Sequence, residues 1–125
     1  MPKVLIVDDD PDVRSMVQTI MNIEGYETQL AVDGQDFLDK VSEFNPEVVT
    51  LDVMMPGLNT WEILSRLHEM QVNPKVILLT IVRYSNSERQ KLFEMGNVVE
   101  YIQKPFDIED LKHAVRQATE LKAEV

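Results

Sequence analysis

Three short, almost entirely apolar runs constrain the fold of this chain more than any other feature. They are residues 4–7, 48–51 and 76–79. Strands this apolar must be covered on both faces, as happens in a parallel sheet with helices on either side. Longer segments of helical period alternate with the runs, which is the pattern of βα units. The sequence therefore predicts an α/β fold in which these three strands are central.

Two further strands are expected at the edges of the sheet. Residues 26–31 and 99–103 mix polar and apolar side chains. Such a mixture suits a strand that faces water on one side. We therefore place these two strands outermost.

Helix caps and apolar spacing predict three helices in the first part of the chain. Asp10 can cap a helix with Pro11 at its first position and Gly25 just beyond its end. A second helix covers residues 34–44, and a third begins near Thr60.

The fourth and fifth helices are expected to differ in how firmly they are anchored. Residues 85–95 are mostly polar, so their helix has few apolar anchors and should be the most mobile element. Asp107 caps the last helix, whose Ile108, Leu111 and Val115 lie on one stripe.

Composition excludes several classes of function. Twelve Lys and Arg against 22 Asp and Glu give a net charge of -10, which disfavours binding to nucleic acid or to an anionic membrane. The absence of cysteine excludes a disulfide scaffold and a thiolate metal site. The first apolar run is too short for a signal peptide or a membrane span. These two features predict a cytoplasmic location. With 125 residues, of which 44% are hydrophobic, we expect one domain over residues 1–125.

Acidic, hydroxyl and basic residues gather at the predicted carboxyl ends of the strands. The first strand is followed by the aspartates 8–10, the third by Asp52, the fourth by Thr80 and the fifth by Lys104-Pro105. In an open parallel sheet, ligands bind outside these ends. Carboxylates, a hydroxyl and an ammonium at one edge can handle Mg²⁺ and phosphate.

The carboxylates themselves favour a metal site. Carboxylates held close together repel one another unless a cation is present. Mg²⁺ prefers oxygen ligands and few carboxylates, so Asp9, Asp52 and the backbone carbonyl of Met54 are candidate ligands. A carboxylate can also attack a phosphoryl group to give an acyl phosphate. Asp52 can act in this way, with Mg²⁺ and Lys104 offsetting the charge on the phosphoryl oxygens.

With these motifs in this order, the sequence resembles the receiver domain of two-component response regulators over essentially its whole length. Residues 51–57 are similar to the family's phosphorylation loop, and Tyr101 matches its aromatic switch position. The remaining matches are the acidic pair Asp8 and Asp9, the phosphoacceptor Asp52, the hydroxyl residue Thr80, and Lys104 with Pro105.

The resemblance implies a fold and a set of roles. The fold would be a flavodoxin-like, doubly wound (βα)5 with strand order 2-1-3-4-5. A cis bond before Pro105 would aim Lys104 into the site, and Thr80 with Tyr101 would form the switch. The ligands of Mg²⁺ would be Asp8, Asp9, Asp52 and the Met54 carbonyl.

The resemblance also implies partners. A histidine kinase or a histidine phosphotransfer protein would donate a phosphoryl group from its phosphohistidine to Asp52. A downstream protein or an output domain would bind the face formed by residues 85–95, the strand around Tyr101 and the final helix. Phosphorylation could also drive formation of a homodimer. The chain would be a signalling switch that catalyses its own phosphotransfer, not an enzyme with turnover.

Three features depart from the family pattern, and two others bear on the lifetime of the phosphorylated state. Ile81 stands where a small residue is usual, Thr60 where a glycine is common, and residues 96–104 hold one residue more than usual. Met54 and Val82 lack the polar side chains that hold a hydrolytic water in fast family members. Slow loss of the phosphoryl group is therefore expected.

Two other functions fit part of the sequence. Phosphatases that resemble haloacid dehalogenases also place Asp-x-Asp after a first strand, but they need a further acidic motif beyond the lysine, where this chain has a single capped helix. A flavodoxin-like FMN protein needs a neutral phosphate loop, and the aspartates 8–10 and Asp12 would repel phosphate.

Several residues with the right chemistry have a simpler interpretation. Asp10 and Asp12 are expected to stabilise the start of a helix. His68 and His113 fall on exposed helix faces without a second ligand at metal-binding spacing, so both are expected to be solvated.

Overall fold

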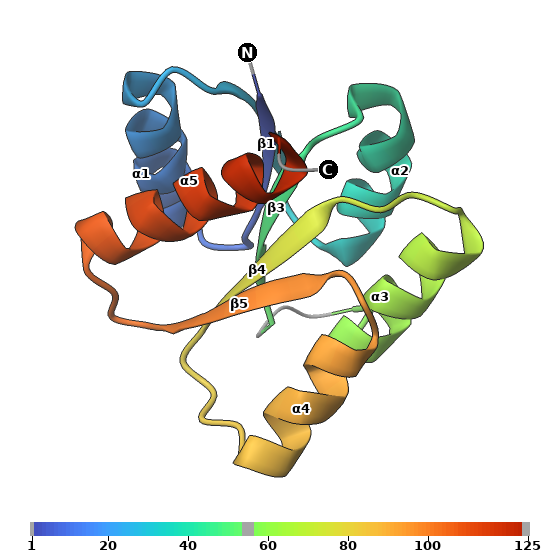
Figure 1. Ribbon diagram of the computed structural model, residues 1–125. Coiled ribbons are helices and arrows are strands. Elements are labelled where there is room, and N and C mark those ends of the chain that lie inside the picture. The colour runs from blue at the N-terminus through green and yellow to red at the C-terminus, as the bar shows by residue number, and fades with distance from the viewer. Residues whose placement is uncertain (1, 54–56, 124–125) are drawn as a thin grey trace.

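Five parallel strands form one sheet in the order β2-β1-β3-β4-β5 (Figure 1). The computed structural model describes residues 2–53 and 57–123. The strands are β1 Lys3–Val7, β2 Glu27–Ala31, β3 Val48–Asp52, β4 Lys75–Thr80 and β5 Val98–Gln103. The three apolar runs are the central strands β1, β3 and β4, and the two mixed segments lie at the edges. The predicted fold class and strand order are confirmed.

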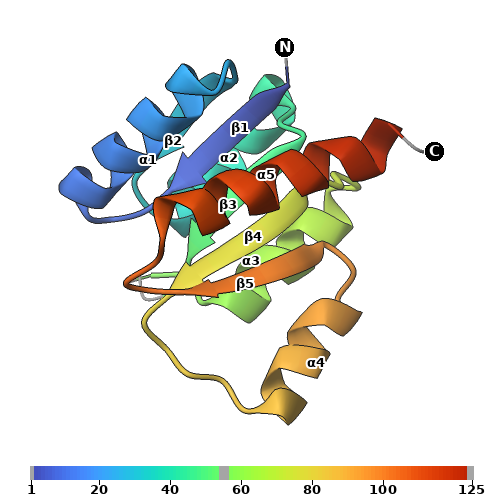
Figure 2. The same ribbon diagram turned by 60° about the vertical axis from the view of Figure 1, so that its left-hand side comes forward.

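Helices cover both faces of this sheet. They are α1 Pro11–Ile23, α2 Gly34–Phe44, α3 Thr60–Glu69, α4 Asn86–Glu94 and α5 Ile108–Ala123. Helices α1 and α5 lie on one face and α2 and α3 on the other, while α4 packs beside the edge strand β5 (Figures 1 and 2). No helix in the described part of the chain is long and apolar enough to span a membrane.

Each face of the sheet has its own buried core. Phe37, Leu64 and Leu92 bring α2, α3 and α4 into one cluster with the strands. Met21 and Leu111 bring α1 and α5 into the other. Because the central strands contribute side chains to both clusters, they must be apolar on both faces, which explains the three runs in the sequence.

Strand β5, within the segment expected to be one residue longer than usual, holds one residue more than its pairing with β4 uses. Val76 of β4 pairs with Val98, but the next residue, Ile77, pairs with Glu100. The skipped residue, Val99, forms a β-bulge, which inserts one residue without ending the pairing of the strands. Tyr101 is thereby placed opposite Leu78.

The helix ends follow the predicted caps. The side chain of Asp10 accepts hydrogen bonds from the backbone N–H groups of Asp12, at 2.9 Å, and Val13, at 3.4 Å. The Asp107 side chain accepts from the Glu109 N–H at 2.8 Å. In α4 Leu92 is buried, and none of the helix's other residues is. The predicted weak anchoring of this helix is therefore confirmed.

Candidate functional site

Three carboxylates from two neighbouring strands meet at the carboxyl edge of the sheet. One oxygen each from Asp8, Asp9 and Asp52 lies within 4.8 Å of the others. Asp8 and Asp9 directly follow β1, and Asp52 is the last residue of β3, which pairs with β1. Asp8 and Asp52 are buried and Asp9 is exposed. Two carboxylates therefore lie at the bottom of the site and one at its rim.

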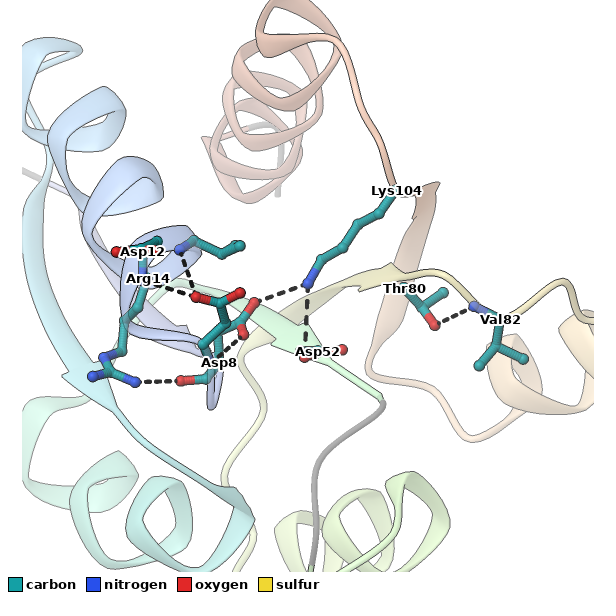
Figure 3. A network of polar contacts seen from close by, with 9 residues as sticks. Asp8, Asp12, Arg14, Asp52, Thr80, Val82 and Lys104 are labelled. Atoms are coloured by element: carbon teal, nitrogen blue, oxygen red, sulfur yellow. Dashed lines mark hydrogen bonds and ion pairs between the residues drawn. The ribbon is translucent and has the colours of Figure 1, made fainter.

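Lys104 contributes a positive charge to the same cluster. Its Nζ lies 3.0 Å from Oδ2 of Asp8 and 3.7 Å from Oδ2 of Asp52 (Figure 3). The backbone N–H of Lys104 donates to the carbonyl of Thr80 at 2.7 Å, which fixes the lysine at the end of β4. The peptide bond to Pro105 is cis, as expected.

Asp8 is held in place by more contacts than the sequence analysis identified. Its Oδ1 accepts the backbone N–H of Asp10 at 2.9 Å, while its Oδ2 faces Lys104. The Arg14 side chain donates to the backbone carbonyl of Asp8 at 2.7 Å (Figure 3). The spacing of Arg14 from the aspartates does not by itself predict this contact. Arg14 joins α1 to the end of β1.

Thr80 lies at the same edge, but its hydroxyl is turned toward the loop that follows β4. The Thr80 side chain is fully buried, and its Oγ1 accepts the backbone N–H of Val82 at 2.9 Å. Figure 3 shows this hydroxyl pointing toward Val82 and away from Asp52. Thr80 is therefore next to the carboxylate cluster without contacting it through its hydroxyl.

Tyr101 and Thr80 both form a hydrogen bond with Val82, which lies in this loop. The Tyr101 hydroxyl donates a hydrogen bond to the Val82 carbonyl. It also accepts the Tyr84 N–H at 3.4 Å. Val82 thus binds Thr80 through its N–H and Tyr101 through its carbonyl. The two residues expected to form a switch are connected through one backbone unit.

The remaining expectations from the sequence concern Met54 and two histidines. Met54, whose carbonyl is an expected metal ligand, lies outside the described residues. His68 and His113 are exposed, as expected.

The cluster has the chemistry of a site for a hard cation and an anion. Three carboxylates face one ammonium group, so negative charge is in excess. The candidate metal ligands of this cluster are all carboxylate oxygens, and Mg²⁺ prefers oxygen ligands. A carboxylate such as that of Asp52 can act as an oxygen nucleophile, and an ammonium such as that of Lys104 can neutralise charge on an arriving group.

Comparisons with known proteins agree with this arrangement. A family model described as the response regulator receiver domain matches residues 4–116. The chain is 36% identical over 122 residues to sporulation initiation phosphotransferase F of Bacillus subtilis, which covers 97% of this chain and 96% of that protein. It is 34% identical over 114 residues to transcriptional regulatory protein TrcR of Mycobacterium tuberculosis. That match covers 91% of this chain but 44% of that protein.

Solved structures show the same similarity. The receiver domain of the Francisella response regulator 1452 superposes with a TM-score of 0.88 at 29% identity, covering 98% of this chain and 99% of that one. The chemotaxis protein CheY4 of Vibrio cholerae gives a TM-score of 0.85 at 28% identity, covering 94% and 98%.

Proposed function

The chain belongs to the response regulator receiver domain family, and from this premise we propose that it accepts a phosphoryl group on Asp52 and changes conformation in response. The donor is the phosphohistidine of a histidine kinase or of a histidine phosphotransfer protein. Residues 1–125 act as a single receiver domain in this proposal. Two-component signalling is the family's general role.

One observation carries the proposal. Lys104 Nζ lies between two buried carboxylates from different strands, 3.0 Å from Asp8 and 3.7 Å from Asp52. Burying two carboxylates is costly unless positive charge balances them. An arrangement of this kind suits a site that takes up both a cation and a phosphoryl group.

The described oxygen donors fit Mg²⁺. Asp8, Asp9 and Asp52 would hold the ion, and one carboxylate oxygen of each already lies within 4.8 Å of the others. The Met54 carbonyl is a further proposed ligand. When bound, Mg²⁺ supplies positive charge that offsets the charge of the phosphoryl oxygens.

The side chains have distinct roles in the transfer. An Asp52 carboxylate oxygen attacks the phosphorus and forms a P–O bond, while the P–N bond of the phosphohistidine breaks and its electron pair stays on the imidazole nitrogen. The Lys104 ammonium neutralises charge on the phosphoryl oxygens. Asp8 orients that ammonium through the 3.0 Å contact.

Thr80 and Tyr101 convert the new charge into a change of shape. A phosphoryl group adds about two negative charges and strong acceptor oxygens. The Thr80 hydroxyl can turn to donate to one of these oxygens, which breaks its bond with the Val82 N–H. Because Tyr101 is bonded to the carbonyl of the same residue, the loop and Tyr101 respond together.

Two surfaces suit the two kinds of partner. An apolar hollow of about 440 Å³ adjoins Lys104, and Met16, Phe106 and Ile108 line it together with Val13 and Pro105. A donor protein can pack there while its histidine reaches Asp52. The downstream protein, an output domain or a second copy of the chain binds the face formed by α4, β5 and α5.

Intact mass spectrometry tests the proposal. With acetyl phosphate and Mg²⁺, the chain should gain the mass of one phosphoryl group and stop there. Asp52→Asn should remove the gain while leaving the fold intact, and Asp39→Asn, on the exposed side of α2, is the matched control. Labelling of the Asp52→Asn variant at the parent rate would refute the assignment. Repeated turnover of a phosphate monoester would instead indicate a phosphatase.

A further inference from the structure

Arg14 makes two hydrogen bonds that bracket the exposed aspartate of the carboxylate cluster. Its side chain donates to the backbone carbonyl of Asp8 at 2.7 Å. Its backbone N–H donates to the Asp10 carbonyl at 2.9 Å, as the first turn of α1 requires. The residue between these two carbonyls is Asp9. Arg14 therefore holds the chain on both sides of Asp9.

The Asp9 side chain itself is held by fewer contacts than that of Asp8. Both carboxylate oxygens of Asp8 have a partner, since Oδ1 accepts the Asp10 N–H and Oδ2 accepts Lys104. The Asp9 carboxylate is exposed, and it forms no such bond within residues 2–53 and 57–123. The position of the Asp9 carboxylate is therefore set by the backbone that carries it.

The side-chain bond of Arg14 acts directly on this backbone. The Asp8 carbonyl belongs to the peptide group that joins Asp8 to Asp9. Because a peptide group is planar, a donor that fixes its oxygen also fixes the direction in which the chain continues to Asp9. On its other side, Asp8 is held by its N–H, which donates to the Ala31 carbonyl at 3.2 Å at the end of the pairing of β1 with β2. The bond from Arg14 extends the order of the sheet by one residue, to Asp9.

The helix that carries Arg14 is firmly anchored at its start. The Asp10 side chain accepts the backbone N–H groups of Asp12 and Val13, which caps α1. Further along, α1 buries Val17 in the core beneath it. Arg14 is itself partly buried. Its guanidinium therefore donates from a fixed point of the fold.

Arg14 is not directed at the place where a phosphoryl group would bind. Figure 3 shows its guanidinium on the α1 side of Asp8, while Lys104 reaches Asp8 from the opposite side, next to Asp52. Lys104 contacts carboxylate oxygens, whereas Arg14 bonds a backbone carbonyl. The two cations therefore have different roles, because Lys104 faces the cluster and Arg14 supports the chain behind it.

We propose that Arg14 is a positioning residue that holds Asp9 ready to bind Mg²⁺. Groups that orient a metal ligand without touching the metal matter for affinity, and their loss typically weakens metal binding by about 10–100-fold. A ligand that is already held in place also loses less conformational freedom when it binds the ion. This inference rests on the proposed function, since it assumes that the carboxylate cluster binds Mg²⁺.

The direction of the change in Mg²⁺ affinity separates positioning from charge. Arg14→Met removes the donor and the charge but keeps an apolar stem and a good helix former. Loss of a positive charge near a cation site would by itself strengthen Mg²⁺ binding. Loss of positioning should instead raise the Mg²⁺ Kd, by about tenfold, as measured from the amide shifts of residues 8–10 during a titration with MgCl₂. Arg14→Gln, which is neutral and too short to take over the contact, should raise the Kd in the same way if Arg14→Met does not fold.

A matched control and a metal-free measurement complete the test. Arg66→Met makes the same replacement at an exposed position on α3 and should leave the Kd within about twofold of the parent's. In the presence of a chelator, the ¹⁵N order parameter of the Asp9 amide should fall in Arg14→Met and stay unchanged in Arg66→Met. A Kd in Arg14→Met equal to or below that of the parent would overturn the proposal. So would an unchanged order parameter at Asp9.

The parent protein distinguishes failure of this inference from failure of the proposed function. If the parent amides do not respond to Mg²⁺, the proposed metal site is wrong, and the order parameter of Asp9 still decides whether Arg14 holds this residue. If the parent binds Mg²⁺ and Arg14→Met binds it equally well, the inference about Arg14 is wrong and the proposed function stands.

Discussion

Replacing Thr50 by valine should stabilise the protein. Thr50 is 1% exposed, and its hydroxyl has no hydrogen-bond partner within residues 2–53 and 57–123. Its neighbours across the sheet are Ile6 and Ile77, both part of the core beneath α1 and α5. A hydroxyl in such a place has lost its water and gained nothing in exchange.

The expected size follows from this environment. Burying a hydroxyl without a partner costs about 1–3 kcal/mol in mutational data. Valine replaces the hydroxyl by a methyl group of similar shape, so no cavity forms and apolar contact is gained. We expect Thr50→Val to raise the free energy of unfolding by about 1–2 kcal/mol. At about 2.1 cal/mol/K of unfolding entropy per residue, this corresponds to an increase in Tm of roughly 4–8 °C.

Urea and thermal unfolding in the presence of a chelator measure this change. Thr19→Val is the matched control, because Thr19 is exposed on α1 and its hydroxyl donates to the Ser15 carbonyl. The control should change stability by less than about 0.5 kcal/mol. Destabilisation by Thr50→Val would refute the reasoning, since it would mean that the hydroxyl has a partner in solution, such as a buried water.

Three further outcomes are expected. Burial raises the pKa of Asp36, but the Val32 N–H and the Lys40 ammonium hold it below its usual range. Asp36→Asn should therefore lower Tm at pH 7, and the difference should shrink as the pH falls through the folded-state pKa, where the parent also loses the charge. Mg²⁺ should raise the free energy of unfolding by about 1–3 kcal/mol at 5 to 100 times its Kd, and Asp9→Ala should abolish this effect. Val82→Glu should shorten the lifetime of the phosphorylated state, by up to about tenfold if about 1.4 kcal/mol of barrier is lost, as followed by intact mass over time.

Each of these outcomes has a result that would contradict it. A Tm difference for Asp36→Asn that is as large at pH 2 as at pH 7 would count against the carboxylate's contribution. Equal Tm values with Mg²⁺ and with chelator would count against a metal site. A longer lifetime in Val82→Glu than in the parent would contradict the account of slow hydrolysis.

The fold could be predicted because central strands that are buried on both faces appear in the sequence as short apolar runs. The central strands β3 and β4 are mostly apolar and buried along almost their whole length, and the edge strand β2 is not. Parallel strands bring their carboxyl ends to one edge, so the gathering of Asp8, Asp52 and Lys104 follows from the topology alone. The helix caps at Asp10 and Asp107 could also be predicted, because a cap depends only on residues close in sequence.

The details of the site depend on contacts that no spacing predicts. The orientation of the Thr80 hydroxyl is set by the Val82 N–H, a local bond that competes with any partner in the site. The contact of Arg14 with the Asp8 carbonyl needs the angle between α1 and β1. The Tyr84 ring reaches the Tyr101 ring only because β5 and the loop after β4 are close in space. Each of these contacts depends on the orientation of a single side chain, and sequence periodicity carries no information about that orientation.

The weak anchoring of α4 fits the proposed switch, in which contacts at Tyr101 would control the position of this helix. Leu92 is the buried residue of this helix, and burying a leucine stabilises by about 1.5–3 kcal/mol. The contact of Arg89 with the Tyr101 ring, where both residues are partly buried, adds about 0.5–2 kcal/mol. Raising the population of one state of a two-state element from 1% to 99% takes a free-energy change of about 5.5 kcal/mol. The contributions of Leu92 and Arg89 together are of the same order. By contrast, α1 buries Val17, Ile20 and Met21, so the same change at Asp52 would leave α1 in place.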